Sequence, residues 1–207
     1  KSMKKIKNIV FDFGGVLVDW NPVYLYSKLF DDEAEMNHFL ENICTPEWNI
    51  QQDAGRSLAE ATEILQKEHP QHKELIGHYY GRWDEMLGGY IKENVRVLEK
   101  LKPNYPLYGL TNWSGETITI AYEMFDFFNH FDGIVVSGDE KLIKPDPELY
   151  KVLLERYDLK PDETLFIDDN LKNIEAADEM GFHTIHLTEN VDLEKEVKEL
   201  GLLKSRT

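Results

Sequence analysis

The stretch Phe11-Asp12-Phe13-Gly14-Gly15-Val16-Leu17 decides the fold, because it joins an apolar run to a glycine turn through a single carboxylate. The run before it, residues 6–11, has the length and the β-branched and aromatic content of a buried strand. Asp12 therefore stands at the carboxyl end of a predicted strand. In open α/β sheets the ligands bind at that end, so the remaining strand ends should carry the other residues of a site.

Four further apolar runs follow along the chain, and each ends at small or polar residues. They span residues 106–110, 133–136, 164–167 and 183–187. Between them lie segments with the helical spacing of apolar residues, at 116–128, 147–157 and 171–180. Because strand and helix alternate, the pattern predicts a Rossmann-like α/β fold, with a parallel sheet and helices on both of its faces.

One long interval, residues 18–93, breaks this alternation and contains no convincing strand. It shows successive amphipathic helices at residues 24–30, 33–43, 57–67 and 75–87, and a helix over 94–101 then resumes the core. A single crossover helix needs far fewer residues, so we interpret residues 18–93 as an inserted helical cap. The core is then formed by residues 1–17 and 94–207. In the alternative interpretation, these helices simply cover one face of the main sheet.

Composition and charge exclude several classes of protein and partner. The 207 residues are 42% hydrophobic and 30% charged, as expected of a soluble globular chain. Acidic residues outnumber basic ones by 39 to 23, so at a net charge of −16 we expect no nucleic-acid partner. No stretch approaches the roughly 20 apolar residues of a membrane span, and no membrane partner is expected. The single cysteine, Cys44, excludes an internal disulfide and favours a reducing, cytoplasmic location.

Polar residues follow four of the predicted strands. Asp12 follows the first, Thr111-Asn112 ends the second, Lys144 lies shortly after the third, and Asp168-Asp169 ends the fourth. All these strand ends face one edge of a parallel sheet, so three carboxylates, an ammonium and several backbone amides converge there. Neighbouring carboxylates raise each other's pKa unless a cation neutralises them, and Mg²⁺ prefers oxygen ligands. A magnesium site is therefore the leading hypothesis.

These segments resemble the four motifs of the haloacid dehalogenase (HAD) superfamily, a group rich in phosphatases. Residues 11–17 resemble motif I, Leu110-Thr111-Asn112 resembles motif II, Lys144-Pro145 resembles motif III, and Phe166-Ile167-Asp168-Asp169-Asn170 with Asn173 resembles motif IV. Each motif is short, but all four occur in order at the ends of predicted strands or just beyond. The helical insertion after motif I also matches the most common cap position of this superfamily.

The resemblance implies catalytic roles for Asp12 and Lys144. Asp12 would be the nucleophile that attacks phosphorus to give an aspartyl-phosphate, which water then hydrolyses. Such an attack needs mainly positioning and charge neutralisation, so a weakly nucleophilic carboxylate is sufficient. Lys144 would offset the negative charge of Asp12 and of the phosphate together.

The resemblance also implies a metal site and a phosphate site. The residues that would hold Mg²⁺ are Asp12, Gly14 through its backbone carbonyl, Asp169, and Asp168 either as a further ligand or behind the ligands. The residues implied to contact the substrate are Thr111, Asn112 through its backbone amide, Gly15 and Trp113. The expected partner is therefore a small-molecule phosphate ester, and the expected cofactor is Mg²⁺.

Gly14 departs from the superfamily pattern, because most of these phosphatases carry a second aspartate at this position, which protonates the leaving oxygen. Glycine has no proton to give, although the backbone carbonyl is kept. Either water or a cap residue supplies the proton, or the substrate has a good leaving group, or the chain is not a phosphatase. Phosphatases of sugar 1-phosphates tolerate glycine here, and an anomeric oxygen leaves more readily than an ordinary alcohol. The resemblance therefore implies Mg²⁺-dependent hydrolysis of a small phosphate monoester, with a sugar 1-phosphate as a candidate.

Other classes remain open. The 2-haloacid dehalogenases also lack that aspartate, need no metal, and depend on an arginine soon after the nucleophile. The sequence has no arginine between Asp12 and Arg56 and carries the acidic pair Asp168-Asp169, which favours the phosphatase. A non-catalytic metal-binding or phosphate-binding protein on this fold would bind without turnover, and the missing acid argues against an efficient mutase.

Several side chains of the predicted cap are candidates for substrate contacts. Trp48 and Trp83 could line a pocket, although buried tryptophans are usually part of a core. Arg56 and Arg82 could contact an anionic or sugar portion, although most such arginines are solvated or paired. The sequence leaves the substrate and the oligomeric state open.

Overall fold

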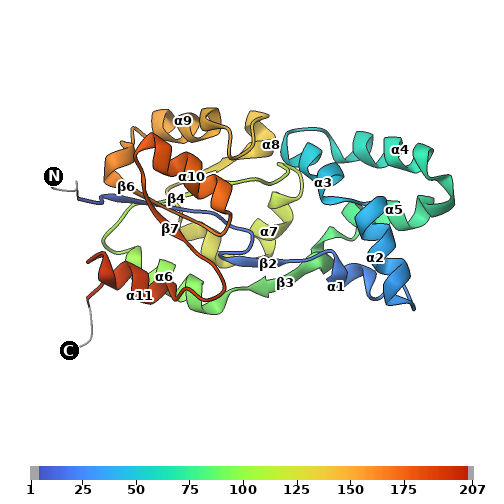
Figure 1. The fold of residues 1–207 in the computed structure, drawn as a ribbon, viewed down its shortest axis with the longest axis horizontal. Helices are drawn as coiled ribbons and strands as arrows, with labels where there is room; N and C mark the ends of the chain where they lie inside the picture. Colours follow the sequence, from blue (N-terminus) through green and yellow to red (C-terminus); the bar gives the residue numbers. More distant parts are fainter. Residues whose placement is uncertain (1–4, 205–207) are drawn as a thin grey trace.

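The computed structural model describes residues 5–204 and confirms the α/β fold (Figure 1). Five strands form a parallel sheet in the order β5-β4-β1-β6-β7. Their bounds are β1 Asn8–Phe11, β4 Leu107–Thr111, β5 Gly133–Val136, β6 Thr164–Asp168 and β7 His183–His186. The predicted runs agree with these strands to within two residues. Because β1 pairs with both β4 and β6, the chain order reverses beside it, and Asp12 directly follows β1 at this switch point.

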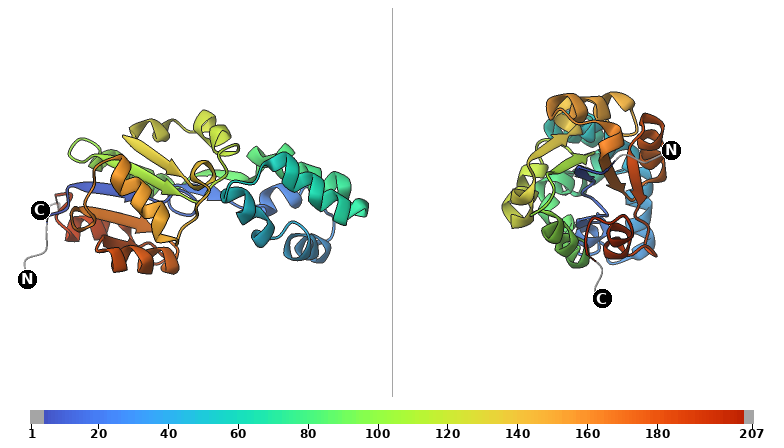
Figure 2. Two further views of the ribbon diagram at one scale, coloured as in Figure 1. Left: turned by 90° about the horizontal axis from the view of Figure 1, so that it is seen from above. Right: turned by 90° about the vertical axis from the view of Figure 1, so that its left-hand side faces the viewer.

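Helices cover both faces of the sheet, as predicted (Figure 2). One face packs against α6 Lys92–Leu101, α7 Ile118–Met124 and α11 Leu193–Glu199, and the other against α9 Pro147–Arg156 and α10 Leu171–Met180. Ile9 and Phe11 belong to the first hydrophobic cluster and Val10 to the second, because successive strand residues point to opposite faces. The shorter elements are α8 Ser137–Glu140 and the 3-10 helices η3 Asp126–His130 and η4 Pro161–Glu163. The predicted helix over 116–128 is thus divided between α7 and η3.

The chain between β1 and α6 forms a second group of helices, which we call the helical lobe (residues 21–86). It consists of α1 Val23–Tyr26, α2 Glu33–Asn42, α3 Pro46–Asp53, α4 Leu58–Glu68, η1 Pro70–His72, α5 Lys73–Gly81 and η2 Trp83–Met86. These helices lie together at one end of the molecule in Figure 1. Four of them were predicted, but α3 was not. Its start carries two recognisable signals, because the Thr45 hydroxyl accepts a hydrogen bond from the Trp48 amide and Pro46 occupies the first turn.

The expectation that residues 18–93 contain no strand is wrong. β2 Val18–Trp20 and β3 Leu87–Tyr90 pair antiparallel, and this two-stranded ribbon joins the helical lobe to the core (Figure 1). Both strands are very short and β3 contains Gly88-Gly89, so neither shows the apolar alternation that indicates a strand. The ribbon brings both ends of the lobe to the same place, as an insertion into a continuous core requires. The boundary of the insertion at residues 18–93 stays a prediction.

Within residues 5–204, no helix combines the length and the apolar character that crossing a membrane would require.

Candidate active site

The turn after β1 is fixed by Phe13, which is completely buried between the functional residues on either side of it. Its ring packs edge-on against Phe128, with 5.0 Å between ring centroids, and lies against Gly109, where a Cβ would come within 2.3 Å of the ring. Its carbonyl accepts hydrogen bonds from the amides of Val16, Leu17 and Val18. The turn therefore holds Asp12 and Gly14 rigidly at the end of the central strand.

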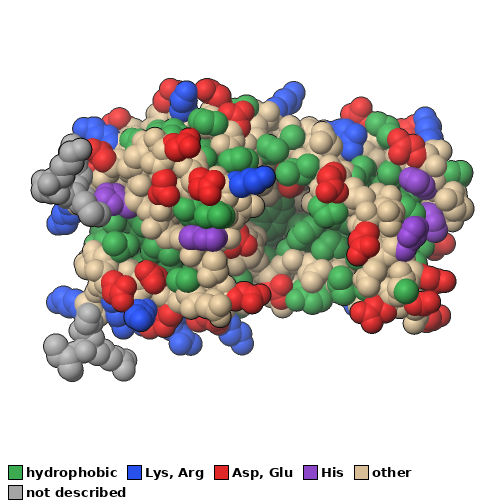
Figure 3. Space-filling model, in the orientation of Figure 1, with side chains coloured by type: hydrophobic (Ala, Val, Ile, Leu, Met, Phe, Trp, Pro, Cys, Tyr) green, Lys and Arg blue, Asp and Glu red, His purple; other side chains and the backbone are tan. Residues whose placement is uncertain are grey.

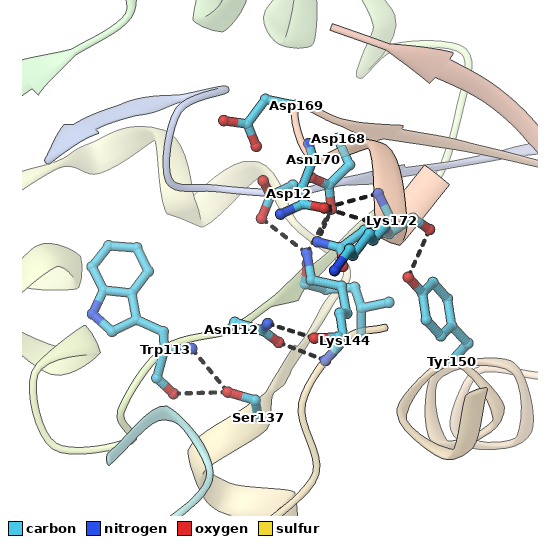
Figure 4. A network of polar contacts seen from close by, with 12 residues as sticks. Asp12, Asn112, Trp113, Ser137, Lys144, Tyr150, Asp168, Asp169, Asn170 and Lys172 are labelled. Carbon is cyan, nitrogen blue, oxygen red and sulfur yellow. Dashed lines mark hydrogen bonds and ion pairs between the residues drawn. The ribbon is translucent and has the colours of Figure 1, made fainter. Parts of the chain in front are cut away.

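Three carboxylates meet at the carboxyl ends of β1 and β6 (Figure 4). Asp12, Asp168 and Asp169 each offer an oxygen, and these oxygens all lie within 4.8 Å of one another. Asp12 is 7% exposed and Asp168 is completely buried, whereas Asp169 is open to the surface. The convergence expected from the strand order is therefore present, and the cluster has one open side.

Lys144 extends into the same cluster (Figure 4). Its Nζ lies 2.9 Å from Asp12 Oδ1 and 2.9 Å from Asp168 Oδ2, and it donates a third hydrogen bond to the Leu110 carbonyl. The Asn112 side chain holds the Lys144 backbone from two sides, because its Nδ2 donates to the Lys144 carbonyl and its Oδ1 accepts from the Lys144 amide. The Asn112 side chain thus positions the lysine, a role that the sequence did not reveal.

The pKa values of the four charged groups in the site are shifted from their ordinary values. Burial raises the pKa of Asp12 well above its ordinary value, with Lys144 opposing this and the other two aspartates adding to it. Burial likewise raises the pKa of Asp169. For Asp168 the burial effect is outweighed by Lys144 and the Asn170 amide, so its pKa is lowered. For Lys144 the two carboxylates outweigh burial and raise its pKa. Lys144 is therefore a charged partner of both Asp12 and Asp168, whereas the raised pKa values of Asp12 and Asp169 show that burial disfavours a second and third negative charge beside it.

This donor set fits Mg²⁺, which takes oxygen ligands and would neutralise the two carboxylates that burial disfavours. Asp12, Asp169 and the Gly14 carbonyl are the groups that could hold the ion. Both oxygens of Asp168 are engaged already, because Oδ1 accepts from the Asn170 amide and Oδ2 accepts from Asn173 and Lys144. Asp168 is thus placed to orient Lys144 without contacting the metal itself, which is one of the two roles that the sequence left open.

Gly15 lies where Asp169 approaches the turn. A Cβ at Gly15 would come within 2.3 Å of Asp169 Oδ2, and its φ of +80° is a left-handed conformation that favours glycine. Its amide donates to the Val18 carbonyl at 2.9 Å, and a contact between Gly15 and the substrate stays a prediction. The geometry gives Gly15 a role in making room for the Asp169 carboxylate.

A pocket of about 100 Å³ lies between the core and the helical lobe beside the acidic cluster. It is lined by Gly14, Trp20, Asn49, Asp53, Trp83, Asn112, Trp113 and Thr117. In Figure 3 the surface is hollowed between the two parts of the molecule, and hydrophobic side chains gather around this hollow. Thr111, the last residue of β4, is buried next to Asn112. The pocket is therefore lined by three tryptophans and four polar side chains.

The pocket includes only part of what was predicted for the cap. Trp83 and Trp113 line it, whereas Trp48 packs against Tyr79 and Tyr80 inside the lobe. Arg82 is paired with a glutamate at 2.5 Å. Three lining residues of the lobe and its ribbon were not predicted from the sequence, namely Trp20, Asn49 and Asp53. Asn49 and Asp53 belong to α3, so recognising the helix start at Thr45-Pro46 would have placed both on one helix.

Comparison with known proteins agrees with the fold and the four motifs. The model of the family described as haloacid dehalogenase-like hydrolase matches residues 9–187, and the chain belongs to this family of enzymes. A sesquiterpene phosphatase of Aspergillus oryzae is 27% identical over 198 residues, which cover 94% of this chain and 96% of that protein. The D-ribitol-5-phosphate phosphatase of Bacteroides thetaiotaomicron is 26% identical over 213 residues, which cover 93% of this chain and 97% of that protein.

A solved structure shows the same fold. It is the magnesium complex of a HAD family enzyme from Bacteroides thetaiotaomicron, with a TM-score of 0.74 and 24% sequence identity. The superposition covers 94% of this chain and 100% of that chain. The similarity therefore includes both the core and the helical lobe.

Proposed function

We propose that this chain is a Mg²⁺-dependent phosphatase that hydrolyses a small phosphate monoester through an aspartyl-phosphate on Asp12. The observation that carries the proposal is the joint placement of Asp12, Asp169 and Lys144 at the carboxyl end of the central strand, with oxygens of Asp12, Asp168 and Asp169 within 4.8 Å of one another. A bound Mg²⁺ would neutralise these carboxylates and polarise a phosphoryl oxygen. The relatives named as phosphatases support the same reaction class.

Each side chain of the site then has a separate role in the proposed reaction. Asp12 attacks phosphorus in line with the leaving oxygen, and Lys144 offsets the charge that collects on Asp12 and the phosphoryl group. Thr111 and the Asn112 backbone amide hold phosphoryl oxygens, while the Asn112 side chain keeps Lys144 in place. Water then hydrolyses the aspartyl-phosphate and frees Asp12 for the next cycle.

The pocket indicates the class of leaving group. Among the described residues that line it there is no lysine or arginine, so a second phosphate or a carboxylate would find no counter-charge and would face Asp53. Flat tryptophan walls with a few amide, hydroxyl and carboxyl groups suit a neutral hydroxylated or apolar group. We therefore place a neutral alcohol there, and a sugar 1-phosphate remains the candidate substrate. The relatives named for D-ribitol 5-phosphate and a sesquiterpene are consistent with a neutral leaving group.

A larger groove of about 970 Å³ is less suitable for the substrate. It is lined by Gly15, Asp169, α6 and residues 187–194. Besides Asp169 its lining carries four carboxylates and a single arginine, Arg96, so its field is net negative and repels a phosphate ester. We therefore assign the substrate to the smaller pocket over Gly14, which grows when the lobe moves away.

Residues 18–93 act in this proposal as the cap. The β2–β3 ribbon is the hinge, and two hydrogen bonds hold the lobe against the core. The Ser137 hydroxyl donates to the Asp53 carbonyl at 2.5 Å, and the Leu58 amide donates to Glu116 at 2.9 Å. Closure would exclude water while Asp12 attacks, and opening would admit the substrate.

The dehalogenase alternative is disfavoured by the same geometry. The three clustered carboxylates could hold a metal ion that a metal-independent dehalogenase does not need, and no arginine between Asp12 and Arg56 is present to receive halide. The test is a panel of phosphate esters and 2-haloacids assayed with Mg²⁺ and with chelator. We expect phosphate release that chelator abolishes. Halide release that is insensitive to chelator would overturn the proposal, and bound Mg²⁺ without any turnover would identify a non-catalytic protein.

A further inference from the structure

The space at Gly14 has room for the first side-chain atom that glycine does not provide. A Cβ at Gly14 would meet nothing within 4 Å in the described part of the chain, and the backbone there has no left-handed φ. Neither sterics nor conformation therefore requires glycine at this position. Gly14 lines the small pocket together with Asp53, the one carboxylic acid among its lining residues.

The core holds the end of α3, and with it Asp53, in place. The Asp53 carbonyl accepts the Ser137 hydroxyl at 2.5 Å, and Ser137 is completely buried in the core. The chain then passes close to the core at Gly55, where a Cβ would lie 2.8 Å from Lys141 Cγ and 3.3 Å from the Gly138 carbonyl. In this arrangement of lobe and core, the Asp53 side chain is held at the pocket wall.

The surroundings of Asp53 favour its neutral, proton-carrying form. Burial raises the pKa of Asp53 to about 7, and only the Ser114 backbone amide is a significant opposing influence. A carboxyl group with a pKa near neutrality can both donate and accept a proton efficiently. Trp20 lines the same pocket, and its buried indole N–H has no hydrogen-bond partner among the described residues, so it is a donor that a bound molecule could satisfy.

We propose that Asp53 is the catalytic acid of this enzyme, which supplies from the helical lobe the proton that an aspartate at position 14 would otherwise give. This inference rests on the proposed phosphatase function. In the first step, the Asp12 carboxylate forms a bond to phosphorus, the bond from phosphorus to the ester oxygen breaks, and the Asp53 carboxyl proton moves to that oxygen. In the second step, water attacks the aspartyl-phosphate, its proton passes to the Asp53 carboxylate, and phosphate and Asp12 are released.

The first test compares two esters in the Mg²⁺-loaded protein. Glycerol 2-phosphate has a poor alkoxide leaving group that needs a proton, whereas p-nitrophenyl phosphate has a phenolate that leaves without one. Asp53→Asn keeps the shape of the side chain and removes the acid. We expect kcat/KM, which reports only the step in which the alcohol leaves, to fall about 10²-fold for glycerol 2-phosphate and to change by less than about threefold for the aryl ester. Glu47→Gln, at an exposed position on the same helix, is the matched control and should change neither rate.

Equal losses of kcat/KM with both esters would show that Asp53 acts in folding or binding, and no loss of kcat/KM with either would show that it gives no proton to the leaving group. Both results would overturn the inference. They differ from failure of the proposed function, in which the unaltered protein would hydrolyse neither ester.

A second variant keeps the test decisive if Asp53→Asn fails to fold. Gly14→Asp places a carboxyl group in the open space, two residues after the nucleophile. If Asp53 already donates the proton, this change should raise kcat for glycerol 2-phosphate by less than about threefold. A gain of about 10²-fold would mean that the natural chain lacks a proton donor, and Asp53 would lose the assigned role.

Discussion

Lys144 lies 2.9 Å from Asp12 although 132 residues separate them along the chain. The lysine is 2% exposed and also neutralises Asp168, so it is the internal counter-ion of the site, and the proposed mechanism gives it a catalytic role as well. Lys144→Met should abolish detectable phosphatase turnover. It also leaves two buried carboxylates without their cation, which costs about 3–5 kcal/mol in the free energy of unfolding.

Urea denaturation without metal measures this cost. The matched control is Lys151→Met, because Lys151 also pairs with a carboxylate at 2.9 Å but lies on the surface, with half of its side chain exposed. That variant should leave the urea midpoint unchanged. Equal stability of the two variants would show that the buried lysine is not the counter-ion of the site.

Replacement of Asp12 by Asn tests the nucleophile. The amide occupies the same volume but cannot form an aspartyl-phosphate, so turnover of every phosphate ester should disappear. The fold should survive, because burial already raises the pKa of Asp12 and an uncharged group is easily buried there. Circular dichroism and the thermal midpoint check the fold, with Asp31→Asn at an exposed position of the lobe as the control for turnover. Retained turnover in Asp12→Asn would remove Asp12 as the nucleophile.

The core could be predicted because its strands are buried on both faces. Val10 and Phe11 are both completely buried although they point to opposite sides of the sheet, so each strand is a continuous apolar run that stands out in the sequence. The position of Asp12 and the Asp168-Asp169 pair then follows from strand ends meeting at one edge, without knowledge of side-chain packing. Lys144 instead lies beyond α8, and the Asn112 side chain holds it in place.

The lobe side of the site could not be predicted in the same way. Asp53 reaches the pocket only because the ribbon β2–β3 returns the lobe to the core and Ser137 holds the end of α3 there. These contacts join residues far apart in sequence and produce no local periodicity. The pairing of the Gly15 amide with Val18 likewise depends on the turn, which the sequence indicates but does not specify.

The adjacent glycines of the turn should respond differently to alanine. Gly15→Ala forces a side chain into a left-handed φ of +80° and against the Asp169 carboxylate, which should cost about 1–3 kcal/mol of stability. Because Asp169 must then move, Mg²⁺ affinity should fall about tenfold or more. Gly14→Ala meets open space and should change stability by less than about 0.5 kcal/mol. Isothermal titration with Mg²⁺ and urea denaturation compare the variants, and similar affinity losses in both would contradict the assigned role of Gly15.

Protons should compete with Mg²⁺ for Asp12 and Asp169 at a higher pH than they would for aspartates with an ordinary pKa. Burial raises the pKa of Asp12 and of Asp169, so in the metal-free chain the folded state holds their protons more tightly than the unfolded state does. Their ionisation therefore lowers stability as the pH rises from the ordinary pKa of 3.8 to the raised values, and this cost shrinks as the pH falls below the raised values and is gone below 3.8. Mg²⁺ acts in the opposite direction, because it binds only the ionised carboxylates of the folded state.

The stabilisation by Mg²⁺ should thus be largest at alkaline pH. As the pH is lowered, it should decline well before the pH reaches the ordinary aspartate pKa of 3.8. At 100 times its dissociation constant the ion should add about 2.7 kcal/mol at pH 8, and the gain should be much smaller at pH 5. Thermal midpoints with and without Mg²⁺ at the two pH values measure it. Asp169→Asn, which removes one ligand, should show little gain at either pH. If the unaltered protein gained the same increment at both pH values, Asp12 and Asp169 would not be the ligands, since their protonation would then leave metal binding unaffected.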